Sequence, residues 1–142
     1  MTDTTTLQRI LTDYKRIAVV GLSADPSRPS NIVGKYLLQH GFEVIPVNPK
    51  YDEVLEQKCY PDLTSIPTPV DIVDLFQRAE RVPPFVDDAI AIGAKVIWMQ
   101  LGIVHEEAAK KARSAGLEVV MDLCIKIEHA RLLGGATGAN GH

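Results

Sequence analysis

The residues with the clearest chemical potential lie in a polar, proline-containing loop over residues 21–31, which directly follows an apolar run. Gly21 can adopt backbone angles that are closed to other residues, and it lets a ligand approach the main chain. Ser30 and Asn31 are both good N-cap residues for the helix that the sequence predicts over residues 32–40. The free N–H groups and the positive dipole end of such a helix would face the loop and suit a phosphate group. The stretch therefore predicts a cradle for the phosphates of a nucleotide-type ligand.

The two standard phosphate-binding motifs are both absent from this stretch. The dinucleotide fingerprint needs two more glycines after Gly21, and an acidic residue at the end of the second strand, where Lys50 stands. A Walker A loop needs a serine or threonine directly after its lysine, but Lys35 is followed by a tyrosine. The cations Arg28 and Lys50 suit a ligand with several phosphate charges, and Lys50 also suits a ribose that carries its own phosphate. An NAD(P)- or flavin-dependent enzyme with a degenerate Rossmann loop is the first alternative.

A second alternative is a thiol enzyme that uses Cys124, which follows the fifth predicted strand on the ligand side. A thiol at a helix start can be a nucleophile of low pKa, whereas free cysteines are also among the most buried residue types. The segment 105–107 resembles half of a zinc-protease motif without its second histidine, which favours a helix start. Asp74 lies within an apolar strand, where it is either buried or turned into the site, and Trp98 is expected in the core.

Length and composition restrict the class of protein. A chain of 142 residues with 46% hydrophobic residues is one globular domain by size. The net charge of −3, with lysines and arginines scattered along the chain, argues against a nucleic-acid-binding face. We expect no membrane association, because no apolar run is long enough to span a bilayer and the first six residues show no signal-peptide pattern. Cys59 and Cys124 predict two free thiols in a reducing cytoplasm rather than a disulfide framework.

Five apolar runs alternate with helical patterns along the chain. This order predicts an α/β fold: a single-domain, Rossmann-like, doubly wound, mainly parallel five-stranded sheet with helices on both faces. Pro46 cannot donate to a ladder, so the second strand belongs at an edge or is irregular there. We expect a disordered N-terminus over residues 1–6, the domain over residues 7–133, and a glycine-rich flexible tail over residues 134–142. The predicted strands cover residues 17–20, 42–47, 70–76, 95–100 and 117–121.

Six segments, taken in order, carry a resemblance to a known family. They are IAVVGLS at residues 17–23, RPS at 28–30, VIPVNP at 44–49, VDIVDLF at 70–76, VIWMQLG at 96–102 and DLCIKIE at 122–128. Together they resemble the small stand-alone CoA-binding proteins, which are similar to the CoA-binding domain of the succinyl-CoA synthetase alpha subunit. The resemblance implies a Rossmann-like fold that holds coenzyme A at the carboxyl ends of the strands.

The resemblance also implies which segments hold the ligand. The loop after the first strand would meet the phosphates, the segment after the second would hold the adenosine end, and the segment after the third would line the nucleotide or pantetheine path. The synthetase carries its phosphorylated histidine in a second domain that this sequence does not show, so we expect a module that binds CoA or acyl-CoA without catalysis of its own. The residues expected to bind are Gly21, Leu22, Ser23, Arg28, Ser30, Asn31, Asn48, Pro49, Lys50, Phe76, Gln77 and Arg78.

Overall fold

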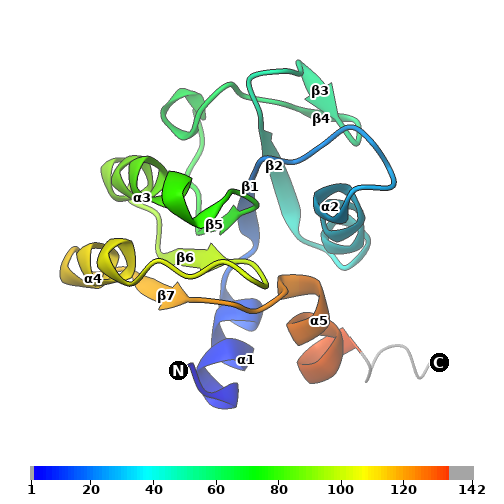
Figure 1. The fold of residues 1–142 in the computed structure, drawn as a ribbon. Coiled ribbons are helices and arrows are strands. Elements are labelled where there is room, and N and C mark those ends of the chain that lie inside the picture. Colours follow the sequence, from blue (N-terminus) through cyan, green and yellow to red (C-terminus); the bar gives the residue numbers. More distant parts are fainter. Residues whose placement is uncertain (1, 135–142) are drawn as a thin grey trace.

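A parallel five-stranded sheet forms the centre of the protein, as a computed structural model that describes residues 2–134 shows (Figure 1). The strand order is β2-β1-β5-β6-β7, and every neighbouring pair is parallel. The predicted Rossmann-like, doubly wound fold is therefore confirmed. The strands of this sheet are β1 (Arg16–Val20), β2 (Glu43–Val47), β5 (Ile72–Leu75), β6 (Val96–Met99) and β7 (Glu118–Val120).

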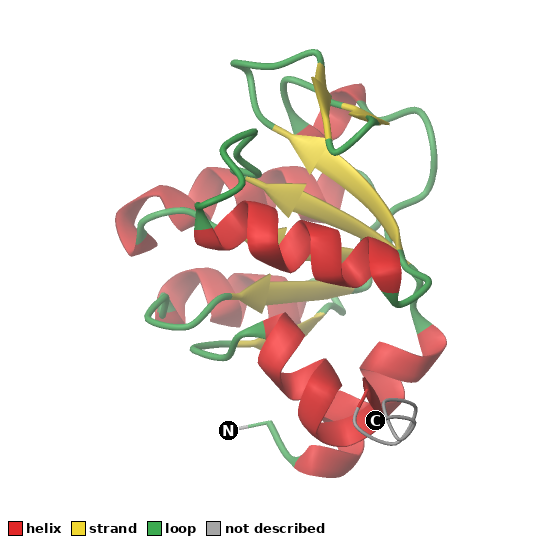
Figure 2. Cartoon of the chain, turned by 90° about the vertical axis from the view of Figure 1, so that its right-hand side faces the viewer, coloured by secondary structure: helices red, strands yellow, loops and turns green. Residues whose placement is uncertain are grey.

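Helices cover both faces of the sheet, which is why its strands read as unbroken apolar runs (Figures 1 and 2). The helices α1 (Thr4–Asp13), α2 (Pro29–Gln39) and α5 (Ile125–His129) contribute to the hydrophobic cluster on one face. The helices α3 (Val82–Ala91) and α4 (Glu106–Ser114) contribute to the cluster on the other face. Trp98 is fully buried in the first cluster, as expected from the sequence.

The strand order creates a switch point between β1 and β5. The chain leaves β1 toward β2 on one side, and then crosses back to add β5, β6 and β7 on the other side. In sheets of this kind the ligand crevice opens at the carboxyl ends of the two strands that flank the switch point. The position of β2 at the sheet edge confirms the expectation from Pro46. Proline has no N–H to donate, and at the edge of this sheet no further strand of the sheet needs that donor.

The boundaries of several elements differ from the sequence predictions. Helix α1 begins at Thr4, because the Asp3 side chain caps it by accepting a hydrogen bond from the Thr6 amide, so the disorder predicted for residues 1–6 is wrong for residues 4–6. Helix α5 begins at Ile125 and continues as a π-helix over Ala130–Gly134. Gly134 thus ends a helix, whereas the remainder of the predicted flexible tail lies outside the described residues.

A small hairpin follows β2 that the sequence did not predict. It consists of β3 (Glu53–Val54) and β4 (Gln57–Lys58), joined by Leu55 and Glu56 at φ of 53° and 63°. Left-handed angles at both central positions belong to the tight turns that normally use glycine or asparagine, so the usual signal for such a turn is missing. Two 3₁₀ turns complete the fold, over Leu63–Ser65 and Ala79–Arg81. Over residues 2–134, no helix has the length and apolarity that crossing a membrane requires.

Candidate functional site

A cavity of about 660 Å³ opens at the carboxyl ends of β1, β2 and β5, beside the switch point. Its wall includes the last residues of the first two strands, Val20 and Val47, and the residues that directly follow all three strands. Of the twelve residues predicted from the sequence, the cavity brings together Gly21, Ser23, Arg28, Asn48, Pro49, Lys50, Phe76 and Gln77. The loops that the topology places at one edge of the sheet therefore meet around one cavity.

The main chain around Gly21 leaves no room for a side chain at this position. Its φ is +88°, and a Cβ at this position would lie 2.5 Å from the carbonyl oxygen of Phe76 and 3.0 Å from Nε2 of Gln77. The Gly21 amide donates to the Val47 carbonyl at 2.8 Å, which ties the ends of β1 and β2 together. Only glycine fits this crossing of three loops, so the residue brings the cavity walls close to one another.

Ser30 and Asn31 hold the loop over residues 21–31 from behind. The Ser30 hydroxyl accepts a hydrogen bond from the Ser23 amide at 2.9 Å, and the Asn31 side-chain amide donates to the Ser23 carbonyl at 2.8 Å. Both side chains are buried, and neither lines the cavity. The prediction that one of them caps the helix is wrong, because α2 begins at Pro29 with Arg28 as its N-cap residue. Proline suits the first helical position, where an N–H would have no intrahelical partner.

Asn48 joins the loop after β2 to the loop after β1. Its side-chain amide donates to the Leu22 carbonyl at 3.2 Å, and its side-chain oxygen accepts from the Lys50 amide at 3.0 Å. The Leu22 side chain is fully buried in the core, so only its main chain takes part in this network. These bonds preorganise the two loops without using the side chains of Arg28 and Lys50.

The cavity carries a net positive charge in a protein of net charge −3. Arg28, Lys50 and Arg81 line it, and Asp25 is the only carboxylate among the described lining residues. The Ser27 amide and hydroxyl both donate to Asp25, at 2.9 and 2.8 Å, and they lower the pKa of Asp25. Asp25 therefore stays ionised, and the three cations outweigh this one anion, so the cavity favours an anionic ligand.

Aromatic rings form a second part of the wall. Tyr51, Phe76 and Phe85 line the cavity, and a flat apolar surface of this kind suits the face of a nucleobase. Arg81 and Phe85 also line the cavity but were not predicted from the sequence, because they lie beyond the segment that directly follows the third strand. Arg78 was expected there instead, but it is the exposed N-cap residue of the following 3₁₀ turn and does not line the cavity.

The other chemical candidates lie outside this cavity. Cys124 is the half-buried N-cap residue of α5 and is absent from the cavity wall. His105 caps α4, with its Nδ1 accepting from the Ala108 amide at 3.1 Å, which confirms the predicted helix start. No cluster of His, Cys, Asp and Glu among residues 2–134 could hold a metal ion.

The Asp74 side chain lies in the core and not in the candidate site. It is fully buried, pairs in register with Val19 and Trp98, and its carboxylate oxygens have no hydrogen-bond partner among the described residues. Burial raises the pKa of Asp74 well above its ordinary value, because ionisation would leave an unsolvated charge. Asp74 therefore affects the stability of the fold and does not contact a ligand in the cavity.

Taken together, the fold and the site define a class: a Rossmann-like α/β domain with a cationic, aromatic-lined cavity at the switch point of its sheet. The family follows from comparison with known proteins. The chain belongs to the CoA binding domain family, whose model matches residues 15–130.

Relatives of two kinds share this domain. The chain is 45% identical over 124 residues to the uncharacterized protein YneT of Bacillus subtilis, covering 87% of this chain and 92% of that one. A solved structure of a hypothetical protein from Pyrococcus horikoshii OT3 superimposes with a TM-score of 0.91 at 50% identity, covering 94% of each chain. The chain is also 36% identical over 100 residues to the ADP-forming acetate–CoA ligase II of Archaeoglobus fulgidus, covering 69% of this chain but only 15% of the ligase.

Proposed function

We propose that this protein binds coenzyme A or an acyl-CoA in the cavity at the switch point, through the ligand's phosphates. The observation that carries the proposal is the convergence of Arg28, Lys50 and Arg81 on one cavity beside the first turn of α2. CoA carries a diphosphate and a separate phosphate on its ribose, and a phosphate monoester alone holds about −1.5 to −2 charges at neutral pH. Several cations around one cavity match several phosphates, and membership of the CoA binding domain family supports the same ligand.

The separation of the charges suggests how the ligand lies. Arg28 follows β1 and stands at the start of α2, where helix amides add positive potential, so it suits the diphosphate. Lys50 follows β2, the position at which dinucleotide-binding folds place an acidic residue for a free ribose. A lysine there suits a ribose that carries a phosphate. The aromatic wall formed by Tyr51, Phe76 and Phe85 would then receive the adenine.

We further propose that the protein is a binding module without catalysis of its own. The chain spans 15% of the acetate–CoA ligase that it resembles, so that enzyme's activity needs much that this chain does not match. The described residues that line the cavity include no histidine and no cysteine. Their charged side chains suit the holding of a ligand more than acid–base or nucleophilic chemistry.

Isothermal titration tests the proposal. CoA and acetyl-CoA should both bind, and Arg28→Ala or Lys50→Ala should each weaken binding by about one to two orders of magnitude, since a charge-assisted hydrogen bond contributes about 1.5–3 kcal/mol. Lys110→Ala, which removes an exposed lysine of α4 remote from the cavity wall, is the matched control and should leave binding unchanged. No binding of CoA, or tighter binding of NADH than of CoA, would refute the proposal.

A further inference from the structure

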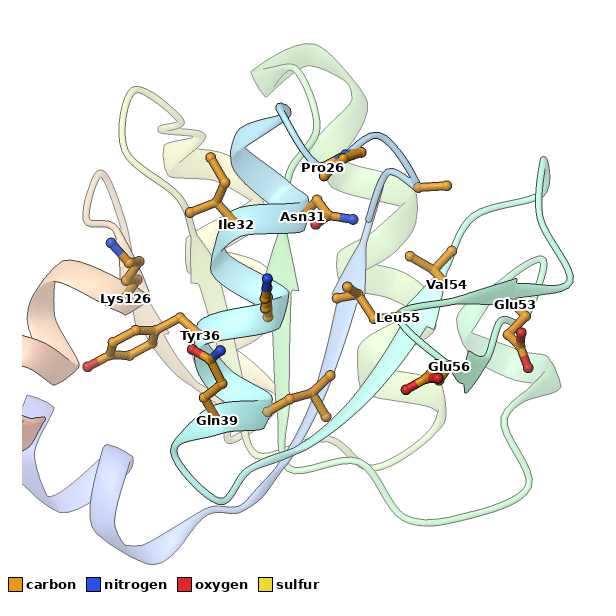
Figure 3. Close-up of a pocket in the computed structure, with 13 residues that line it drawn as sticks. Pro26, Asn31, Ile32, Tyr36, Gln39, Glu53, Val54, Leu55, Glu56 and Lys126 are labelled. Atoms are coloured by element: carbon orange, nitrogen blue, oxygen red, sulfur yellow. The ribbon is translucent and has the colours of Figure 1, made fainter.

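A second cavity, of about 950 Å³, runs along the outer side of α2 (Figure 3). We call it the α2 groove. It lies between the β3–β4 hairpin on one side and the start of α5 on the other. The loop after β1 separates the groove from the candidate CoA site, since Ala24 and Pro26 line the groove whereas Ser23, Asp25 and Arg28 line the site. The groove is therefore a distinct surface.

The floor of the α2 groove is apolar and held in place. Ile32 is 45% exposed, and Tyr36 and Leu55 are half-buried beside it. Leu55 packs over α2 at Gly34, where an added Cβ would lie 3.1 Å from the leucine Cδ1. Leu55 and Glu56 both adopt left-handed backbone angles in the hairpin that makes this contact. The groove therefore offers a preformed apolar floor, open to water, that suits contact with an apolar surface of another molecule.

The charges around the groove are separated by sign. Lys126 lies on the α5 side, with its ammonium 5.6 Å from the centre of the Tyr36 ring, whereas Glu53 and Glu56 lie on the opposite, hairpin side (Figure 3). Lys35 also lines the groove, so its two lysines balance its two glutamates. Within residues 2–134, none of these four side chains forms an ion pair. A strongly charged partner such as a nucleic acid would find no net attraction there.

We propose that the α2 groove is where a second copy of this chain docks, in a two-fold symmetric dimer. In such a dimer the same patch serves both protomers, so the patch must complement itself. A cation on one side and anions on the other satisfy this condition, because the two-fold rotation places Lys126 of each copy against Glu56 of the other. Ile32 and the neighbouring apolar side chains are then removed from water at the centre of the interface. This inference is independent of what the candidate site binds.

Charge reversal tests the pairing. Sedimentation velocity over about two orders of magnitude of protein concentration should show a monomer–dimer equilibrium for the parent protein. Lys126→Glu and Glu56→Lys should each weaken dimerisation at least about tenfold. Each substitution occurs in both protomers, so like charges meet at both contacts between residue 126 and residue 56. An equimolar mixture of the two variants should recover the dimer, since the mixed pair restores an attractive contact at both positions. The experiment needs no CoA.

Two controls separate the loss of the dimer contact from unfolding and from a general effect of charge. Lys110→Glu changes the same charge on α4, outside the groove lining, and should dimerise like the parent. Far-ultraviolet circular dichroism confirms that each variant is folded, and recovery in the mixture does so independently. A parent protein that is monomeric throughout, a dimer that tolerates both reversals, or a mixture that stays monomeric would overturn the proposal.

Discussion

Asp74 provides the sharpest test, because its carboxyl lies fully buried in the middle of β5 with no hydrogen-bond partner within residues 2–134. Burial raises the pKa of Asp74 well above its ordinary value, so the folded protein holds this carboxyl neutral. The unfolded chain ionises it near the ordinary pKa of about 3.9. Between these two pKa values the folded state binds the extra proton, so stability falls as the pH rises.

The size of the effect follows from proton linkage. The free energy of unfolding should fall by about 1.4 kcal/mol for each pH unit between the ordinary and the raised pKa of Asp74. Asp74→Asn, which cannot ionise, should remove this part of the slope. Asp74→Val fills the position with an apolar side chain of similar size and removes the unsatisfied oxygens, so it should match or exceed the parent in stability at neutral pH.

Urea unfolding measures both effects, at a series of pH values from about 4 up to neutrality. Asp13→Asn removes an exposed carboxylate at the end of α1 instead and serves as the matched control, which should keep the pH profile of the parent. Parallel profiles for the parent and Asp74→Asn would show that Asp74 ionises in the folded protein. A strongly destabilised Asp74→Val would show that the carboxyl has a partner and that the reasoning from burial is wrong.

Three further predictions concern the site and the thiols. Gly21→Ala should destabilise the protein by at least about 2 kcal/mol in urea unfolding, because the added Cβ would lie 2.5 Å from a backbone oxygen; Gly93→Ala, which shares a positive φ but faces open space, should cost only about 1 kcal/mol. Ser30→Ala should remove the hydrogen bond that holds the loop beneath the cavity, lowering stability by about 1 kcal/mol and weakening CoA binding; unchanged titration curves would contradict its role. Burial raises the pKa of the Cys59 thiol, so Cys124, which is half-buried, should react faster with a thiol reagent near neutral pH, as single-cysteine variants would show; a faster Cys59 would contradict the burial argument.

Helix and loop boundaries show where local sequence signals compete. Ser30 and Asn31 are strong N-cap types, and the sequence placed them at a helix start. The structure uses both side chains to hold the main chain of Ser23, and it starts α2 earlier at Pro29. The types of the residues predicted a polar function, but the choice between helix cap and loop support depends on which backbone groups the fold brings within reach.

The wall of the candidate site shows a second limit. Gly21, Arg28 and Lys50 could be identified because they lie in the segments that follow β1 and β2, where the topology of a doubly wound sheet places its ligand. Arg81 and Phe85 reach the same cavity from the start of α3. The sequence does not show that these two residues reach the cavity. Whether they do depends on the angle at which α3 packs, and tertiary contacts set that angle.

The sequence by itself determined the architecture of this protein. Its apolar runs have the length of buried strands, and they alternate with helical patterns, so a parallel sheet with covered faces is the arrangement that buries them. Pro46, by removing one donor, limited its strand to an edge or to an irregular course, and the strand lies at the edge. These signals are local, because each depends on the chemistry of residues that are neighbours in the chain.

Only the tertiary structure decided what the individual polar residues do. It buried Asp74 away from any hydrogen-bond partner in the described part of the chain, gathered three cations from separate segments, and closed a glycine-free hairpin over α2. The physical reason is that burial, electrostatic potential and loop strain depend on groups that are distant in sequence and near in space. The sequence shows that a residue is charged, but it does not show whether the side chain faces water, a ligand or the core.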